Sequence, residues 1–320
     1  MYFQKIRHPS NFIFAHAYAD STLHIGSKPV QALVRDLGED VFHVELRDIT
    51  RWPIDARVLP MLDDAFDRGT ATSKLRISPA GNLELSDAKG DTVLSGIEGA
   101  SIGVCGNAWL LQWSRSADMR FFGQGEKVTG MEKSGKRTKF WNADVWADHA
   151  MHTIEHGTAD PQYAAIPYLL VRQGGQWVGI LVDNPGAVFM DTGSNWFFFG
   201  KDDQNAPPAF WMGADDGVPA LYVIAGDSAA SVTERLQRLV GTTPLPPLWS
   251  LGHHQSRWGY AGTQQLNELD AGFSAHAFPN DGLWLDIDYM DNYKVFTTHP
   301  AHFGDLKAEL AALQAKGRRI

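Results

Sequence analysis

Apolar and polar positions alternate with a period of two over much of the first 240 residues, as they do in half-buried strands. Residues 41–46, Val-Phe-His-Val-Glu-Leu, form one such run. Two pairs of runs flank glycine-containing turns and predict hairpins: 74–78 with 82–85, and 168–172 with 177–182. Because short strands at this spacing are typical of an antiparallel β-sandwich, we expect a sandwich domain over residues 1–240.

The spacing becomes helical after about residue 228. Residues 231–240 place Val232 and Leu239 on one helix face. Beyond a proline-rich stretch the predicted order is strand, helix, strand, helix: 249–254, 264–276, 282–288 and 305–316. Such alternation indicates a parallel sheet, and Arg318–Ile320 has the pattern of a third strand.

Only two strand–helix units follow residue 240, whereas a closed eight-stranded barrel needs about 250 residues. We therefore expect residues 241–320 to form the start of a barrel that is not completed within this chain. An open barrel leaves a strand edge unpaired and apolar helix faces exposed. For that reason we expect residues 245–320 to be less stable than the sandwich.

Charge and cysteine content narrow the class of protein. The 320 residues carry 28 Lys and Arg against 37 Asp and Glu, a net charge of −9, which argues against nucleic acid or an anionic membrane as the main partner. The single cysteine, Cys105, excludes an internal disulfide and favours a reducing, cytoplasmic location. Its apolar, strand-like surroundings predict a buried and inert thiol. No apolar run approaches the ~18 residues of a membrane span, and the amino terminus lacks a signal-peptide pattern.

Tryptophan is the compositional outlier, with 11 residues in the chain. Indole faces stack on the C–H faces of sugars, but they also fill cores and interfaces. Composition leaves both interpretations open.

Two carboxylates lie at the end of a predicted strand. Asp286 and Asp288 are two residues apart, so on a strand over 282–288 they would point to one face, ~6.6 Å apart along it. Asp291 follows three residues later. Barrel enzymes place their active sites at the carboxyl ends of their strands, and glycoside hydrolysis uses paired carboxylates. The spacing fits equally well a structural pair, in which one acid caps a loop and the other pairs with a basic side chain.

Several motifs, taken together, resemble a known family. Residues 284–291, Trp-Leu-Asp-Ile-Asp-Tyr-Met-Asp, resemble the second barrel strand of glycoside hydrolase family 31, the α-glucosidase family. Other segments that are similar to the start of its barrel, its sandwich and its active-site loop are 244–249, 251–255, 257–260, 122–127, 135–137, 140–144, 166–168 and 179–184. These motifs occur in the family's order, and the resemblance covers residues 121–320.

The resemblance implies a galactose-mutarotase-like β-sandwich with an active-site loop near residues 123–160, followed by the first two units of an incomplete TIM barrel. Asp286 matches an acid that hydrogen-bonds sugar hydroxyls in the −1 subsite. Trp258 matches an aromatic residue lining that pocket, and Asp144 matches the acid that the sandwich loop brings to the pocket mouth. Four more residues have supporting roles under this interpretation: Arg257, Asp288, Tyr289 and Asp291.

The resemblance also implies a reaction, the retaining hydrolysis of terminal α-linked glucose from oligosaccharides by two carboxylates. The family's nucleophile and acid/base lie on later barrel strands, past the position of Ile320. We therefore expect no catalytic residue in this chain, and Asp286 with Asp288 is not the catalytic pair. No cofactor or metal is implied. The rival hypothesis is a non-catalytic carbohydrate-binding sandwich, which does not explain the presence of Trp258 and Asp286.

Two further signals carry less weight. His149, His152 and His156 have the spacing of metal ligands on a helix, but exposed loop histidines fit the same pattern and are favoured. Gly123-Gln124-Gly125 could open a phosphate-binding loop, but Val128 stands where the third glycine belongs. We expect neither a metal site nor a nucleotide site.

Overall fold

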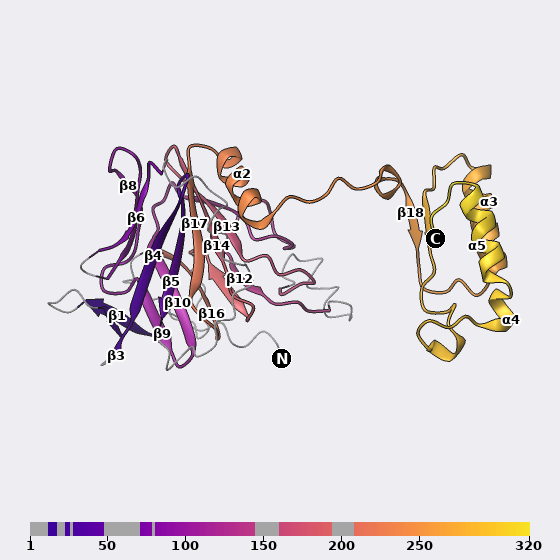
Figure 1. Cartoon of the computed structure of the whole chain (residues 1–320), viewed down its shortest axis with the longest axis horizontal. Coiled ribbons are helices and arrows are strands. Elements are labelled where there is room, and N and C mark those ends of the chain that lie inside the picture. Colours follow the sequence, from indigo (N-terminus) through magenta and orange to yellow (C-terminus); the bar gives the residue numbers. More distant parts are fainter. Residues whose placement is uncertain are drawn as a thin grey trace. The chain divides into compact units, whose positions relative to one another are not determined.

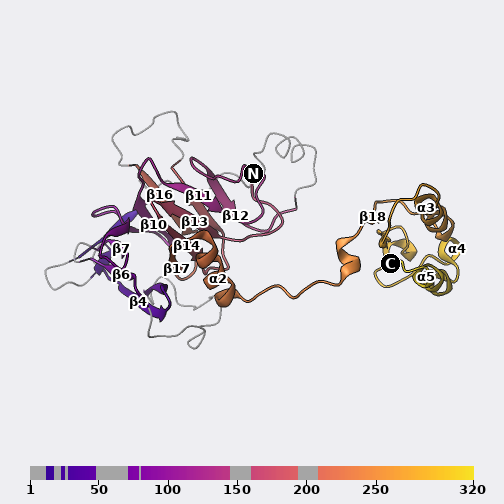
Figure 2. The ribbon, with the colours of Figure 1, turned by 90° about the horizontal axis from the view of Figure 1, so that it is seen from above.

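The computed structural model describes residues 12–17, 23–25, 28–47, 71–78, 81–144, 160–193 and 208–320. The chain divides into two compact units, Met1–Thr242 and Thr243–Ile320, and each is described by itself. Figure 1 and Figure 2 show strands dominating the first unit, whereas helices lie beside a short sheet in the second.

The first unit is built from antiparallel sheets. The strands of the larger sheet are, in spatial order, β12 (Arg137–Phe140), β15 (Val188–Asp191), β16 (Ala209–Ala214), β10 (Ala108–Ser114), β9 (Ile102–Cys105), β1 (Ile13–Ala17), β2 (Leu23–Ile25) and β3 (Lys28–Pro29). Those of the second are β11 (Arg120–Gly123), β13 (Tyr168–Gln173), β14 (Gln176–Val182), β17 (Ala220–Gly226), β5 (Val41–Arg47) and β4 (Gln31–Gly38). A small sheet contains β6 (Lys74–Ile77), β7 (Leu83–Ser86) and β8 (Thr92–Ser95).

Both predicted hairpins are confirmed, since β6 pairs with β7 and β13 pairs with β14 in antiparallel register. One apolar cluster joins inward-facing side chains of both large sheets, which makes this unit a sandwich. Trp113 of β10 stacks on Phe210 with ring centroids 5.3 Å apart. Phe121 of β11 meets the same Phe210 ring edge-on at 5.1 Å. Several tryptophans therefore serve the core, because Trp109, Trp113 and Trp211 are all buried.

Helix α2 (Ala229–Val240) covers the outer face of the six-stranded sheet. Val232 and Leu239 are buried against Tyr222 and Ile224 of β17, as the helical spacing predicted. The helix begins at Ser228, whose hydroxyl accepts a hydrogen bond from the backbone N–H of Ser231 at 3.1 Å, with the reciprocal bond also present.

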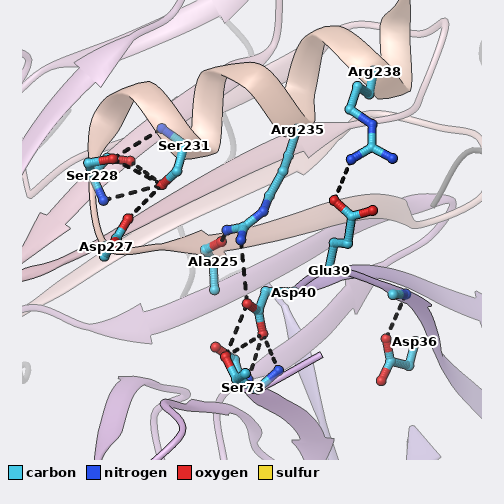
Figure 3. A network of polar contacts seen from close by, with 12 residues as sticks. Asp36, Glu39, Asp40, Ser73, Ala225, Asp227, Ser228, Ser231, Arg235 and Arg238 are labelled. Atoms are coloured by element: carbon cyan, nitrogen blue, oxygen red, sulfur yellow. Dashed lines mark hydrogen bonds and ion pairs between the residues drawn. The ribbon is translucent and has the colours of Figure 1, made fainter. Parts of the chain in front are cut away.

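Polar contacts connect α2 to the turn between β4 and β5, and that turn to the segment before β6 (Figure 3). Arg235 donates to the carbonyl oxygen of Ala225 and lies 3.6 Å from the Asp40 carboxylate. Asp40 also accepts the backbone N–H groups of Thr72 at 2.7 Å and Ser73 at 2.6 Å. The Asp40 carboxylate is therefore a shared acceptor for the helix and for the segment that leads into β6.

The second unit holds a short parallel sheet with helices beside it. Its elements are η2 (Leu248–Leu251), β18 (His254–Ser256), α3 (Thr263–Ala275), β19 (Gly282–Trp284), η3 (Asp291–Tyr293), α4 (Pro300–Phe303) and α5 (Leu306–Ala315). Strands β18 and β19 pair in parallel, and Arg319 forms a parallel bridge to Gly282. The alternating order of strands and helices thus gives an incomplete (β/α) barrel with a small core, whose buried members are Tyr260, Leu266, Leu283, Phe303 and Leu313.

Three sequence-based expectations were wrong in detail. The predicted strand over 249–254 is largely the 3₁₀ turn η2, because Ser250 and Gly252 donate backbone hydrogen bonds to Pro247 and Trp249, and pairing starts only at His254. The predicted strand over 282–288 ends at Trp284. Cys105 is half-buried rather than buried.

The early end of β19 has a local cause. The carboxylate of Asp286 accepts the backbone N–H of Ile287 at 2.8 Å, and Met290 donates back to the carbonyl oxygen of Ile287 at 3.2 Å. These bonds form a turn in place of sheet pairing. Asp286 and Asp288 lie beyond the end of β19, so the prediction that they share one face of a strand was wrong.

A buried carboxylate ties the helices of the second unit together. Asp270 of α3 is 2 % exposed. It accepts from Lys316 Nζ at 2.9 Å and from Arg318 Nε at 2.6 Å, and both donors follow directly after α5. Arg318 also donates to the carbonyl oxygen of Asn280. Burial alone would raise the pKa of Asp270, but the hydrogen bonds from Arg318 and Lys316 outweigh it and hold that pKa below its ordinary value of 3.8.

We expect this lowered pKa to make the second unit acid-sensitive. A carboxyl with a depressed pKa in the folded state stabilises fully above the unfolded pKa, and this contribution is lost as the pH falls below about 4. The free energy of unfolding is measured at pH 6 and at pH 3 by urea titration, with circular dichroism at 222 nm as the signal. In Asp270→Asn the stability should change less between the two pH values, because the titrating carboxyl is gone. An equal loss of stability in wild type and Asp270→Asn would contradict the role of Asp270.

No described helix is long and apolar enough to cross a lipid bilayer.

Candidate functional site

The carboxyl ends of the parallel strands gather several predicted site residues. Ser256 lies opposite Trp284 in the β18–β19 register, so the segments that follow both strands leave the sheet at one edge. Trp258 follows β18, and its indole Nε1 donates to Asp288 Oδ1 at 3.2 Å, across thirty positions of sequence. The hydroxyl of Tyr293 donates to the same oxygen at 3.3 Å. The parallel register thus brings Trp258 and Asp288 together.

Asp286 has a different environment from Asp288. Its carboxylate accepts the backbone N–H of the adjacent Ile287, and no other donor among the described residues reaches it. The side chain is half-buried beside the strand edge. A carboxylate can accept about four hydrogen bonds, so Asp286 retains capacity for the hydroxyls of a ligand.

The other predicted supporting residues shape the loops at this edge. Arg257 is exposed and donates to the Trp258 carbonyl oxygen at 3.4 Å. Tyr289 packs against the small core, and its carbonyl oxygen accepts from the backbone N–H of His299 at 2.7 Å. Asp291 donates its backbone N–H to Thr297 Oγ1 at 3.0 Å. Among the described residues, neither Tyr289 nor Asp291 hydrogen-bonds Trp258 or Asp286.

Sequence reasoning missed a second indole at the same edge. Trp284 Nε1 donates to His254 Nδ1 at 3.0 Å, and His254 Nε2 lies 3.0 Å from the carbonyl oxygen of Trp249. Because Nδ1 accepts from the indole, Nε2 carries the proton and donates to Trp249. His253 instead packs on Phe273 of α3, with ring centroids 5.3 Å apart. The two adjacent histidines therefore have different partners: His254 bonds Trp284, and His253 packs against α3.

Asp144 belongs to the first unit, at the stem of the predicted active-site loop. Its carboxylate accepts from the hydroxyl of Tyr163 at 3.0 Å, and Ala143 donates to the carbonyl oxygen of Gln162 at 3.0 Å. These contacts close the stem of segment 145–159. That segment, with His149, His152 and His156, lies outside the described residues. Within the described ranges, no three His, Cys, Asp or Glu side chains gather as metal ligands.

A buried ion pair anchors the same stem. Lys127, whose side chain is 2 % exposed, pairs with Asp160. It also donates to the carbonyl oxygen of Lys139 at 2.5 Å and lies 4.5 Å from the centre of the Phe140 ring. Burial raises the pKa of Asp160, although the charge of Lys127 opposes this. The pair joins the end of the loop to strand β12 and to the segment after β11.

A cavity of about 490 Å³ lies beside this stem in the sandwich unit. Its lining is mostly apolar and includes Ile166, Pro167 and Val240. Trp141, which is 45 % exposed, and Asn142 add an aromatic face and an amide. Among the tryptophans that the structure describes, the exposed ones are Trp141 in the first unit and, in the second, Trp258 and Trp284, at 69 % and 53 %. A ligand can reach each of these three indoles.

Comparison with known families gives matches in both units. Residues 243–320 match the family model "Glycosyl hydrolases family 31 TIM-barrel domain". Residues 68–191 match "Glycosyl hydrolase 31 N-terminal galactose mutarotase-like domain".

Individual relatives agree. Alpha-glucosidase 2 of Bacillus thermoamyloliquefaciens is 35 % identical over 228 residues, which cover 71 % of this chain and 27 % of the relative. Human neutral alpha-glucosidase AB is 31 % identical over 205 residues, which cover 61 % of this chain and 21 % of the relative. The GH31 dextranase of Flavobacterium johnsoniae, solved with isomaltotriose, superposes with a TM-score of 0.76 at 18 % identity, over 97 % of this chain and 38 % of that one. This chain therefore spans well under half the length of these relatives.

Proposed function

Since the chain belongs to glycoside hydrolase family 31, we propose that it supplies part of the sugar-binding site of a retaining α-glucosidase that removes terminal α-linked glucose from oligosaccharides. The observation that carries the proposal is the convergence of Trp258, Asp288 and Asp286 at the carboxyl edge of β18 and β19. In (β/α) barrels this edge bears the active site.

Each proposed contact follows from the side chain's chemistry. Asp286 accepts hydroxyl groups of the glucosyl residue, because its carboxylate retains free acceptor capacity. Trp258 offers an exposed indole face that stacks on the C–H face of the ring. We also retain Asp144, which Tyr163 holds in the sandwich unit, as a proposed sugar-binding carboxylate. The proposed site consists of acids and aromatic rings, and no cofactor takes part in the proposal.

The proposed reaction needs a nucleophilic carboxylate and an acid/base carboxyl. The first attacks the anomeric carbon while the second protonates the leaving oxygen. The second then deprotonates the water that releases the sugar. We assign neither role to a residue of this chain, and therefore expect the 320-residue polypeptide to bind sugar without turning it over.

A cytoplasmic location is part of the same proposal and rests on the single half-buried Cys105.

The rival function, a carbohydrate-binding sandwich, is favoured by one observation, the cavity beside the half-exposed Trp141. Its mostly apolar lining offers fewer hydroxyl partners than the strand edge does. We therefore rank it second.

One experiment separates the two functions. Maltose is titrated into the full chain and into Trp258→Ala and Trp141→Ala, two substitutions at exposed positions that leave both cores intact. We expect Trp258→Ala to abolish binding and Trp141→Ala to preserve it. The reverse result would favour the sandwich site. The wild-type chain should release no p-nitrophenol from p-nitrophenyl α-glucoside, and measurable release would show that a catalytic pair is present after all.

A further inference from the structure

We propose that Asp288 is the positioning residue for Trp258: by accepting the indole N–H, it sets the plane that the indole presents to a bound glucosyl ring. The inference rests on the proposed function, because the plane of Trp258 matters only if a sugar stacks on it. It also separates the roles of two neighbouring acids, of which Asp286 contacts sugar and Asp288 acts through the indole.

Two donors converge on one oxygen of Asp288. The indole Nε1 of Trp258 lies 3.2 Å from Oδ1, and the Tyr293 hydroxyl lies 3.3 Å from it. Hydrogen bonds to an ionised carboxylate are about twice as strong as those between neutral groups. Asp288 itself is half-buried, whereas Trp258 and Tyr293, the two donors, are exposed.

Packing cannot replace the hydrogen bond. Trp258 is 69 % exposed, so few neighbouring side chains restrict its ring. Exposed side chains exchange rotamers within picoseconds to nanoseconds unless something holds them. The backbone turns away directly after Trp258, at Gly259 with φ +101, a conformation that L side chains rarely adopt. The link to Asp288 is the one hydrogen bond of the Trp258 side chain among the described residues.

The acceptor is itself anchored. Tyr293 and the preceding Asn292 have φ values of 58 and 50, in the left-handed region that non-glycine residues seldom occupy. Such backbone persists only where surrounding contacts maintain it. Here Thr297 and Lys294 make hydrogen bonds to Asp291 that close the turn. The turn places the Tyr293 hydroxyl on Asp288, which fixes the carboxylate that in turn orients Trp258.

Nuclear magnetic resonance of the indole N–H groups in the ¹⁵N-labelled full chain tests the positioning directly. Trp258→Phe and Trp284→Phe identify the two resonances, and Trp284, which donates to His254, is the internal control for folding. We expect Asp288→Ala to shift the Trp258 resonance and to speed its exchange with solvent. Asp288→Asn should shift the signal less than Asp288→Ala does, because its Oδ1 still accepts, but as a neutral and weaker acceptor. A Trp258 signal that is unmoved in Asp288→Ala would overturn the proposal.

A maltose titration followed on the same resonance tests the consequence for binding. We expect the affinity of Asp288→Ala to be about fivefold lower than wild type, the scale of one lost hydrogen bond, and that of Asp288→Asn to lie between the two. Equal affinities in wild type and Asp288→Ala would overturn the positioning role and leave the proposed function standing. If maltose fails to shift Trp258 even in wild type, the proposed function fails and the positioning role with it.

Discussion

Replacing Asp270 with alanine is expected to destabilise the second unit by about 3 kcal/mol, because it leaves Arg318, whose side chain is 20 % exposed, without its buried partner. Lys316, which is 56 % exposed, loses less because water replaces the carboxylate. A loss of this size is a large part of the stability of a unit of 78 residues, Thr243–Ile320. We expect the loss to be confined to that unit.

Amide hydrogen exchange of the full chain measures this outcome segment by segment. Protection should fall in α3 and α5 and stay unchanged in β14 and β17 of the sandwich. Glu268→Ala is the matched control, since it removes an exposed acid of the same helix that bonds only Gln264 among the described residues. Equal protection in Asp270→Ala and Glu268→Ala would refute the prediction. The wild-type data also test the expectation that residues 245–320 are less stable than the sandwich.

Replacing Lys127 with methionine is expected to destabilise the sandwich by about 3 kcal/mol, since it leaves the mostly buried Asp160 carboxylate without its cation. Methionine keeps the unbranched shape, so the change isolates the charge and its hydrogen bonds. For a unit of this size the melting temperature should fall by roughly 6–12 °C.

Differential scanning calorimetry of the full chain checks the effect on stability. Lys89→Met removes an exposed lysine from the β7–β8 turn and should leave the melting temperature within about 1 °C of wild type. The double variant Lys127→Met with Asp160→Asn should recover part of the fall in melting temperature, because the unpaired carboxylate is replaced by a neutral amide. If Lys127→Met melts at the wild-type temperature, the ion pair contributes nothing to the stability of the stem.

Local chemistry explains which elements were predictable. The hairpins β6–β7 and β13–β14 follow from period-two runs around glycine turns, and α2 follows from its one apolar face. The strand ends were not predictable. At Asp286 a side chain competes with the sheet for the N–H of Ile287, and apolar periodicity does not encode that competition.

The sequence by itself determined the family, the antiparallel sandwich and the parallel start of a barrel, because motif order, periodicity and turn residues are local properties that are read along the chain. Only the tertiary structure decided which tryptophans fill the core and which stay exposed. It also decided that Asp288, not Asp286, holds Trp258, and that Lys127 pairs with Asp160. These contacts join residues about thirty positions apart, so they depend on strand register and burial, which arise only when the chain packs.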